Sequence, residues 1–577
     1  MNTQVHIFQP STAFVHIVIT PSTESVTYIF TVDLFTGCLL FSSTPYVDIF
    51  KSHRQACTFI VQKYNKPTFH MQEWQGKALI GITIENQYLV IGLIEGARKC
   101  ATLPNGSVIK QVNSTNFITI PLKSSHSQQK PNFSSFPINK MHFYCETMDI
   151  TRPYPSEHSI TDYDESFCWN QRWRLPFARF GVEYVCIVLL QGYAKTSTTS
   201  CMTYIIRRSV LNPYTRYTSR GTDEMGSPGN ESECELIFYD ENENGDFQSN
   251  CWRRGSIPMM WKTVVGAVGS GQHIISQEQG NVTSLYFHSI SERFENIPIT
   301  VVSLLSESEV ELNEAYKKAV KPLDFVDFQS FDIQAVSENA RIEQFQLFMK
   351  PLIDQNECFT IGDQKGIQKR QKQIFRFNCV DSTDRTNLAT FVYGRILTEM
   401  KRGPLTINPK PNDFLANAFI KGGDVISILY TSTEATLTKP IRDTTQNISS
   451  AKHDASIACI RRVNHFYGND AVLDKSIENW ISIVGLNSNP LFSLDNFYLS
   501  LVQDSSMTFK VMSPVDPSVI SFEYTSTKVE SIDGSFEMII ELPMPMVIGV
   551  LRMMFLPHCF GDITKSFNLE CGMNSNH

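Results

Sequence analysis

The residues best suited to chemistry are one cysteine and one arginine six positions apart, followed directly by a threonine and an asparagine. They are Cys379 and Arg385 in the segment Arg-Phe-Asn-Cys-Val-Asp-Ser-Thr-Asp-Arg-Thr-Asn, residues 376–387. The apolar run 374–377 predicts the end of a strand, and apolar residues at 388, 391, 392, 396 and 400 predict a helix. A strand-to-helix turn collects backbone N–H groups and the positive end of a helix dipole, so it is suited to bind an anion.

The chemistry that this turn predicts is hydrolysis of a phosphate ester through a phosphocysteine. Cys379 would attack as a thiolate, which a helix N-terminus and a nearby guanidinium both favour. Arg385 would hold two phosphate oxygens in its planar fork, and the backbone N–H groups of the loop would hold others. Thr386 is expected to cap the helix and to hydrogen-bond to the thiolate or to a phosphate oxygen. The residues expected to bind phosphate are Val380, Ser382, Thr383, Asp384 and Thr386.

The loop also contains two aspartates, which would repel a thiolate and a phosphate if both were ionised and faced inward. We expect Asp381 to face the site with a pKa raised by neighbouring negative charge, to protonate the leaving oxygen and then to activate a water. Asp384 is expected to point away and to brace the loop, although the choice of general acid between the two stays open. The competing interpretation of the short motif is a buried structural cysteine beside a surface arginine.

The longer string resembles the signature of the Sac-domain phosphoinositide phosphatases, R-x-N-C-x-D-C-L-D-R-T-N. Other matches follow in that family's order, and the resemblance covers roughly residues 1 to 470. They are Phe167-Cys168-Trp169-Asn170, Gln191-Gly192-Tyr193, the block from Arg216 to Glu235, Arg254-Gly255-Ser256-Ile257-Pro258 with Trp261, and Ile426-Ser427 through Tyr430.

This resemblance implies removal of a monoester phosphate from the inositol ring of a membrane lipid, with no metal or other cofactor at the chemical step. It places the nucleophile on Cys379, the phosphate-binding arginine on Arg385, and the two loop aspartates on Asp381 and Asp384. The chain departs from the family at 382–383, where Ser-Thr replaces Cys-Leu, so ring specificity stays open. The alternative is a catalytically weak Sac-like scaffold in a membrane-trafficking or lipid-kinase complex. A protein phosphatase that shares the Cys-x5-Arg loop is a third possibility.

Charge and composition restrict the partners. The net charge of −8 argues against nucleic acid as a partner, so a site for an anionic lipid must be local. The fourteen cysteines show neither a CxxC pair nor a zinc-type spacing, and the N-terminus has no signal-peptide pattern. The apolar run 543–560 contains three prolines and an arginine and is too broken to span a bilayer. These features predict a cytoplasmic protein that is peripheral on endomembranes.

Two clusters of basic residues are candidates for contact with the membrane. Four cations lead toward the predicted catalytic strand, where Arg376 follows, and we expect this run to adjoin the phosphate loop and to meet an anionic bilayer. They are Lys365, Lys369, Arg370 and Lys372. The second cluster contains Arg207, Arg208, Arg216 and Arg220. Buried ion pairing with the glutamates that follow explains this second cluster at least as well.

The element pattern predicts a mixed α/β fold in three parts. Residues 1–144 are expected to form a β-rich N-terminal subdomain, with a polar loop at 103–140. Residues 145–480 are expected to form the α/β catalytic part, with a strand at 185–189, surface turns at 223–250, and helices near 308–320, 336–350 and 386–401. Residues 481–577 are expected to form a β-rich, sandwich-like module that could bind a protein partner, with strands at 497–501, 519–524, 536–542 and 546–551.

Overall fold

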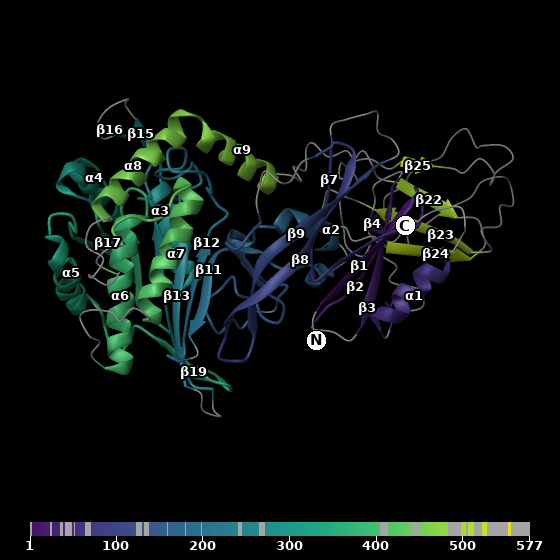
Figure 1. The fold of residues 1–577 in the computed structure, drawn as a ribbon, viewed down its shortest axis with the longest axis horizontal. Coiled ribbons are helices and arrows are strands. Elements are labelled where there is room, and N and C mark those ends of the chain that lie inside the picture. Colours follow the sequence, from purple (N-terminus) through teal and green to yellow (C-terminus); the bar gives the residue numbers. More distant parts are fainter. Residues whose placement is uncertain are drawn as a thin grey trace, which may run out of the picture.

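The structure is a computed structural model of the 577-residue chain, shown as a ribbon in Figure 1. It describes residues 3–22, 26–34, 39–40, 49–50, 52–63, 71–122, 130–131, 138–158, 160–178, 181–197, 199–240, 245–264, 272–403, 413–438, 441 and 450–482. Beyond these, it describes four strands between residues 498 and 554.

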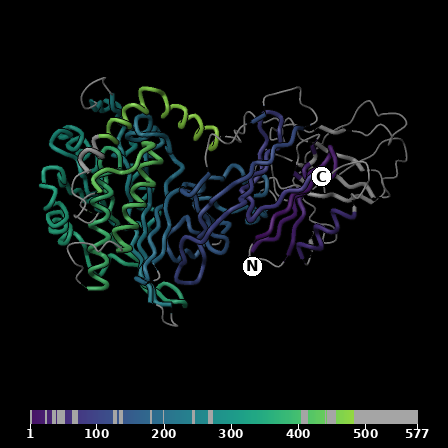
Figure 2. The backbone as a smooth tube through the Cα atoms, in the orientation of Figure 1, coloured from purple at the N-terminus to yellow at the C-terminus, as the bar shows by residue number. Residues whose placement is uncertain are grey.

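The chain begins in an antiparallel sheet that carries one helix (Figures 1 and 2). The strand order is β4-β3-β2-β1-β6, and β5 also pairs with β3. Alternation along β1 sends Val5 and Ile7 into one core and turns Phe8 toward the helix, against Ala56 and Ile60. The elements are β1 (Gln4–Gln9), β2 (Phe14–Thr20), β3 (Thr27–Asp33), β4 (Leu39–Leu40), β5 (Ile49–Phe50), α1 (His53–Lys63) and β6 (Gln72–Gly76).

A second, much longer sheet runs on from there and carries the predicted site. Its first eight strands form an antiparallel series along the chain, from β7 to β14. They are β7 (Ala78–Glu85), β8 (Tyr88–Thr102), β9 (Val108–Pro121), β10 (His142–Cys145), β11 (Leu190–Ser197), β12 (Met202–Arg208), β13 (Ser232–Tyr239) and β14 (Phe247–Gly255).

The far end of this sheet is parallel. Strand β14 pairs in parallel with β21 (Ile374–Asn378), which pairs in parallel with β17 (Ile299–Ser303), and β18 (Val326–Ser330) follows. A hairpin of β19 (Thr360–Asp363) and β20 (Gly366–Lys369) attaches to β14. A separate hairpin consists of β15 (Trp261–Val264) and β16 (Gln272–Ile275).

Helices cover both faces of this parallel end. One core joins α5, α6 and α7 to the sheet, with Trp252 parallel to Phe419 at 6.2 Å between ring centroids. The opposite core joins α3 and α4 to Val301 of β17. The helices are α2 (Gln171–Ala178), α3 (Val282–Arg293), α4 (Val310–Val320), α5 (Arg341–Met349), α6 (Asp384–Arg402), α7 (Phe414–Thr431), α8 (Ser450–Phe466) and α9 (Asn469–Ser482). None of the described helices combines the length and the apolar character that a membrane span requires.

The mixed α/β prediction is confirmed, and the predicted helices near 308–320, 336–350 and 386–401 correspond to α4, α5 and α6. Three local predictions are wrong. Residues 108–121 of the expected polar loop form β9, because the pairing with β8 satisfies their backbone. The strand expected at 185–189 starts at Leu190 instead. Residues 232–239 and 247–250 of the expected surface turns lie in the central strands β13 and β14, because Glu233 and Glu235 are buried against arginines.

Toward the C-terminus the described residues form one four-stranded sheet, in the order β24-β23-β22-β25. The strands are β22 (Tyr498–Val502), β23 (Ser506–Met512), β24 (Phe522–Thr527) and β25 (Arg552–Met554). Strands β22 and β24 overlap the strands expected at 497–501 and 519–524, whereas β23 was not expected. The strands expected at 536–542 and 546–551 lie outside the described residues. The sandwich-like arrangement and the three domain boundaries stay predictions.

Candidate active site

The candidate site forms where three parallel strands end at one edge of the sheet. Asn378 of β21 is in register with Gly255 of β14 and with Ser303 of β17. The next residue along each strand, which is Cys379 in β21, therefore emerges at the same edge. In open α/β sheets this edge, beyond the carboxyl ends of the strands, is where ligands bind. The N-terminus of α6, at Asp384, faces the same loop.

Buried side chains hold the carbonyl groups of the 379–385 loop. Ser256 Oγ donates to Val380 O at 2.8 Å, and Asn230 Nδ2 donates to Asp381 O at 3.0 Å. Arg254 Nη2 donates to the carbonyl oxygens of Ser382 and Thr383. A trans peptide directs its C=O and the following N–H in opposite directions, so these contacts turn the N–H groups of the loop to its other side.

Consistent with this arrangement, the N–H groups of residues 381–383 donate to no backbone acceptor among the described residues. Ser382 adopts a positive φ of 51°, which a tight loop of this kind requires. A row of N–H groups that converge from a short loop forms a concave anion site. The local geometry thus supplies the donors that the sequence predicts for a phosphate.

Cys379 lies at the base of this loop and is only 2% exposed. The hydroxyl of Thr386 donates to its Sγ at 3.2 Å, as the sequence predicts. The capping role expected for Thr386 is wrong, because Thr383 occupies the N-cap position and Thr386 lies inside α6. Position 386 in the first helical turn directs the hydroxyl back at the sulfur instead.

The guanidinium of Arg385 is fixed by Glu309, which the sequence did not indicate. Its Nη1 donates to Glu309 Oε2 at 2.6 Å and to Leu304 O at 3.0 Å, and its Nη2 donates to Glu309 Oε1 at 2.9 Å. Burial opposes the charge on Arg385, but Cys379 and Glu309 outweigh it and raise the pKa of Arg385. Burial likewise opposes the charge on Glu309, whose pKa is nevertheless lowered by Arg385 and Ser306. The Nε of Arg385 has no partner among the described residues, so this edge can still meet an anion.

Asp381 is held between two arginines of the 215–220 turn. Arg220 Nε donates to its Oδ1 at 2.6 Å, and Arg216 Nη2 lies 2.5 Å from its Oδ2. Burial alone would raise the pKa of Asp381, but Arg216 and Arg220 outweigh burial and lower it. The expected upward shift is therefore wrong for the ligand-free site, because two cations reach Asp381 from a turn about 160 residues away in the sequence.

Asp384 points away from the loop, as the sequence predicts. It accepts the backbone N–H of Thr436 at 2.6 Å and a hydrogen bond from Arg461 Nη1 at 2.7 Å. Burial would raise the pKa of Asp384, but Arg461 and Thr436 lower it. Asp384 thus links the start of α6 to α8, and its role as a brace stays a prediction.

The first cationic run lies at the wrong end of the sheet for the role expected of it. Lys369 ends β20, and Lys372 lies just before β21, whose opposite end leads into Cys379. Arg370 pairs with Glu157 at 2.6 Å, and Lys372 Nζ lies 3.7 Å from Glu357. The expectation that Lys365, Lys369, Arg370 and Lys372 adjoin the phosphate loop is wrong, because the strand separates them from it. Their contact with a membrane stays a prediction.

The four arginines of the second cationic cluster fall into two groups, one with a structural role and one at the candidate site. Arg207 is buried and bonds to Glu235, as its ion-pairing interpretation predicts. Arg208 is also buried, and its Nη1 bonds to Gln191 Oε1 at 2.7 Å. Arg216 and Arg220 instead reach Asp381 at the site.

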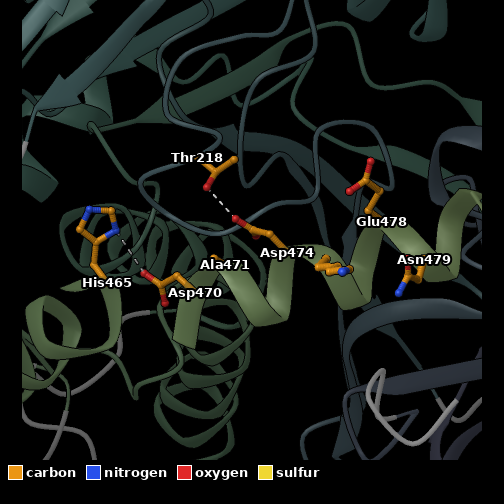
Figure 3. Close-up of a pocket in the computed structure, with 8 residues that line it drawn as sticks. Thr218, His465, Asp470, Ala471, Asp474, Glu478 and Asn479 are labelled. Carbon is orange, nitrogen blue, oxygen red and sulfur yellow. Dashed lines mark hydrogen bonds and ion pairs between the residues drawn. The ribbon is translucent and has the colours of Figure 1, made fainter. Parts of the chain in front are cut away.

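A hollow of about 560 Å³ lies between the 215–220 turn and helix α9 (Figure 3). Its lining includes three carboxylates, so its charge is unsuited to a phosphate, and we do not place the substrate there. They are Asp470, Asp474 and Glu478. Asp474 accepts the backbone N–H of Thr215 and the hydroxyl of Thr218, each at 2.6 Å. Helix α9 thereby anchors the turn that carries Arg216 and Arg220.

Several of these site residues lie in motifs that the sequence singled out, but none of them had been assigned to the candidate site. Arg216, Arg220 and Asn230 belong to the block 216–235, and Arg254 and Ser256 belong to the segment 254–258. These motifs were a usable signal, because each contains polar groups too numerous for an ordinary core strand. Glu309 had no comparable signal.

Comparison with known proteins shows which family this chain is similar to. The family model for the SacI homology domain matches residues 77–338. Synaptojanin of Caenorhabditis elegans is 28% identical over 315 residues, which are 50% of this chain and 28% of that protein. Polyphosphatidylinositol phosphatase INP53 of Saccharomyces cerevisiae is 23% identical over 528 residues, 79% of this chain and 45% of that protein.

A third relative is phosphatidylinositol-3-phosphatase SAC1 of Saccharomyces cerevisiae, which is 24% identical over 291 residues, 44% of this chain and 46% of that protein. The chain thus spans less than half the length of each of these three curated relatives. The resemblance deduced from the motifs is confirmed by a matched segment that contains Asn230, Arg254 and Glu309. The chain is therefore similar to proteins of the Sac-domain family, and the family model covers residues 77–338.

Proposed function

We propose that this protein is a phosphoinositide phosphatase that removes a monoester phosphate from the inositol ring of a membrane lipid through a phosphocysteine on Cys379. The observation that carries the proposal is the loop whose carbonyls are bonded outward by Ser256, Asn230 and Arg254. The names of the relatives support a phosphoinositide substrate.

In the first step, the Cys379 thiolate forms a bond to phosphorus while the bond from phosphorus to the inositol oxygen breaks. Thr386 stabilises the thiolate by its hydrogen bond. The loop N–H groups and the free edge of Arg385 stabilise the phosphoryl oxygens. The inositol oxygen leaves with a proton from Asp381.

In the second step, water attacks the phosphocysteine, the bond between phosphorus and sulfur breaks, and Asp381 takes the proton of the water. The products are inorganic phosphate and the Cys379 thiolate. For this cycle, Asp381 must first gain a proton. A bound phosphate favours this protonation, since it attracts Arg216 and Arg220 away from Asp381 and adds negative charge nearby. Both effects raise the pKa of a carboxyl group.

The test is release of phosphate from vesicles that contain each phosphatidylinositol mono- and bisphosphate, with phosphopeptides in parallel. We expect release from at least one lipid, loss of that release in Cys379→Ser, and full release by the control Cys459→Ser. Cys459 is an exposed thiol on α8, far along the chain from the loop. Release that survives Cys379→Ser, or release from phosphopeptides alone, would contradict the proposal.

A Sac-like scaffold is the second candidate, and two observations favour it. Cys379 is nearly sealed from solvent, and Glu309 occupies one full edge of Arg385. A scaffold would release no phosphate from any lipid isomer, and Cys379→Ser would bind its protein partners as well as the wild type. The same lipid panel therefore separates the two functions.

A further inference from the structure

Three side chains that can bind metals meet on the N-terminal sheet, far from Cys379 in the fold. They are His6, His53 and Cys57, and their nearest ligand atoms lie within 4.8 Å of one another. His6 Nδ1 and His53 Nε2 face each other at 2.6 Å. No zinc-type spacing marks these residues, because the two histidines are 47 positions apart and come together only through the packing of α1 on β1.

The local fold explains why these side chains converge. His6 and Phe8 lie two positions apart on β1, so they share the face that α1 covers. His53 and Cys57 lie four positions apart on α1 and therefore share one face of that helix. Side chains that share a helix face and a strand face in this way form a cluster without strain in either element.

The other ring nitrogen of each histidine also has a partner. His6 Nε2 lies 3.6 Å from Glu73 Oε1, and His53 Nδ1 lies 3.0 Å from Thr20 Oγ1. A histidine that ligates a metal typically donates its second N–H to a carboxylate or another oxygen, which fixes the ring and its tautomer. His53 thus has the outer hydrogen bond that a metal site needs, and His6 has a carboxylate close to the nitrogen that points away from the cluster.

We propose that His6 Nδ1, His53 Nε2 and Cys57 Sγ bind one zinc ion that fastens α1 to the N-terminal sheet. Two imidazoles and a thiolate are a ligand set that Zn²⁺ prefers, and the fourth tetrahedral position is left for water. The side chain of His6 is 22% exposed, so an ion can enter from solvent. The site is independent of the phosphatase chemistry proposed for Cys379.

The alternative occupant of this space is a single proton, shared in a hydrogen bond between two neutral imidazoles. Such a pair satisfies His6 and His53, but it gives Cys57 no function. Ligation by the thiol therefore separates the two interpretations. A thiolate bound to Co²⁺, a common substitute for Zn²⁺, gives an ultraviolet charge-transfer band that imidazole ligands alone do not produce.

The experiment uses the full chain, freed of metal and then titrated with Co²⁺ or Zn²⁺ alone. We expect one Co²⁺ per chain with a thiolate band, displacement of the Co²⁺ by Zn²⁺, and a rise in Tm with Zn²⁺. Cys57→Ser should lose the band and the rise in Tm. The matched control Cys100→Ser, which changes another partly buried thiol, should keep both.

Thr20→Val tests the same site without touching a proposed ligand, and it preserves the shape of the side chain. Loss of an outer hydrogen bond typically weakens metal affinity by about 10- to 100-fold, which we expect for Zn²⁺ here. The proposal is overturned if the wild type binds no Co²⁺ in a 1:1 ratio, or if Cys57→Ser keeps the thiolate band. Equal zinc affinity of Thr20→Val and the wild type would also overturn it.

Discussion

Arg385 and Glu309 form a two-point ion pair, with Nη1 and Nη2 of the arginine on the two oxygens of one carboxylate. The pair joins the first turn of α6 to the start of α4, on two elements more than seventy residues apart. Because Glu309 takes the outer edge of the guanidinium, the Nε edge remains for a phosphate. Under the proposed function, the arginine would meet the phosphate already oriented, which would lower the cost of ordering it during the reaction.

Glu309→Gln should lower kcat on the phosphoinositide substrate by about 10- to 100-fold, because the arginine loses the contact that sets its angle. KM should change less, since the charge of Arg385 is retained. The measurement is steady-state phosphate release, with Glu311→Gln, an exposed neighbour on α4, as the matched control. An unchanged or higher kcat would mean that Glu309 competes with the phosphate for Arg385 instead of orienting Arg385.

Asp381→Asn should have an effect that depends on the leaving group. A general acid contributes about 100-fold or more when the leaving oxygen is a poor one, as on an inositol ring. A leaving group such as p-nitrophenolate needs no proton, so the variant should lose far less activity on p-nitrophenyl phosphate. The check is the ratio of kcat/KM between variant and wild type on both substrates. Equal losses would assign Asp381 only to the positioning of Arg216 and Arg220.

Acid should destabilise the protein through the carboxylates around the loop. Asp381, Asp384 and Glu309 all have a lowered pKa in the folded state. Their contribution is fully present above the unfolded pKa, about 4, and is lost as the pH falls through the lower folded pKa values. Denaturant unfolding should therefore show a free energy of unfolding that decreases steadily from pH 5 downward.

Asp384→Asn tests how much one of these carboxylates contributes to the loss of stability in acid. The variant leaves Arg461 buried without its counter-charge, so it should lose about 3 kcal/mol of stability at neutral pH. It should also show a shallower loss below pH 5 than the wild type. Asp327→Asn, a change at an exposed aspartate on β18, serves as the control and should change neither quantity. Parallel pH profiles for Asp384→Asn and the wild type would contradict this account.

The parts of the site that the sequence predicted are local in the chain. The contact between Thr386 and Cys379 spans seven positions and follows from a strand, a loop and one helical turn. The parts that it missed depend on register between distant strands. Glu309 reaches Arg385 because β17 and β21 pair in parallel and end together, which no single-sequence pattern encodes.

Buried charge was the other source of error. The stretch 223–250, which contains β13, is acidic and rich in glycine, a composition that predicts surface turns. Instead, Glu233 and Glu235 are fully buried, and they pair with Arg207 and Arg253 on the neighbouring strands. The same type of pairing, of Asp381 with Arg216 and Arg220, reversed the expected direction of the pKa shift of Asp381. A sequence pattern shows where charged residues lie, but the partners of those charges decide whether the residues are buried or exposed to solvent.

Asp474→Ala should reduce activity although Asp474 lies on α9 and bonds to no residue of the phosphate loop. Asp474 accepts hydrogen bonds from Thr218 (Figure 3) and from Thr215. The turn that contains these threonines carries both arginines that bind Asp381. Without that anchor the turn gains freedom, so we expect roughly a tenfold loss in kcat/KM with little change in fold. Glu478→Ala, one helical turn further along α9, is the matched control and should keep full activity. Because Asp474 acts through Arg216 and Arg220, Asp474→Ala should lower kcat/KM much less in an Arg216→Ala background than in the wild type. Fully additive effects in this double-mutant cycle would refute the coupling.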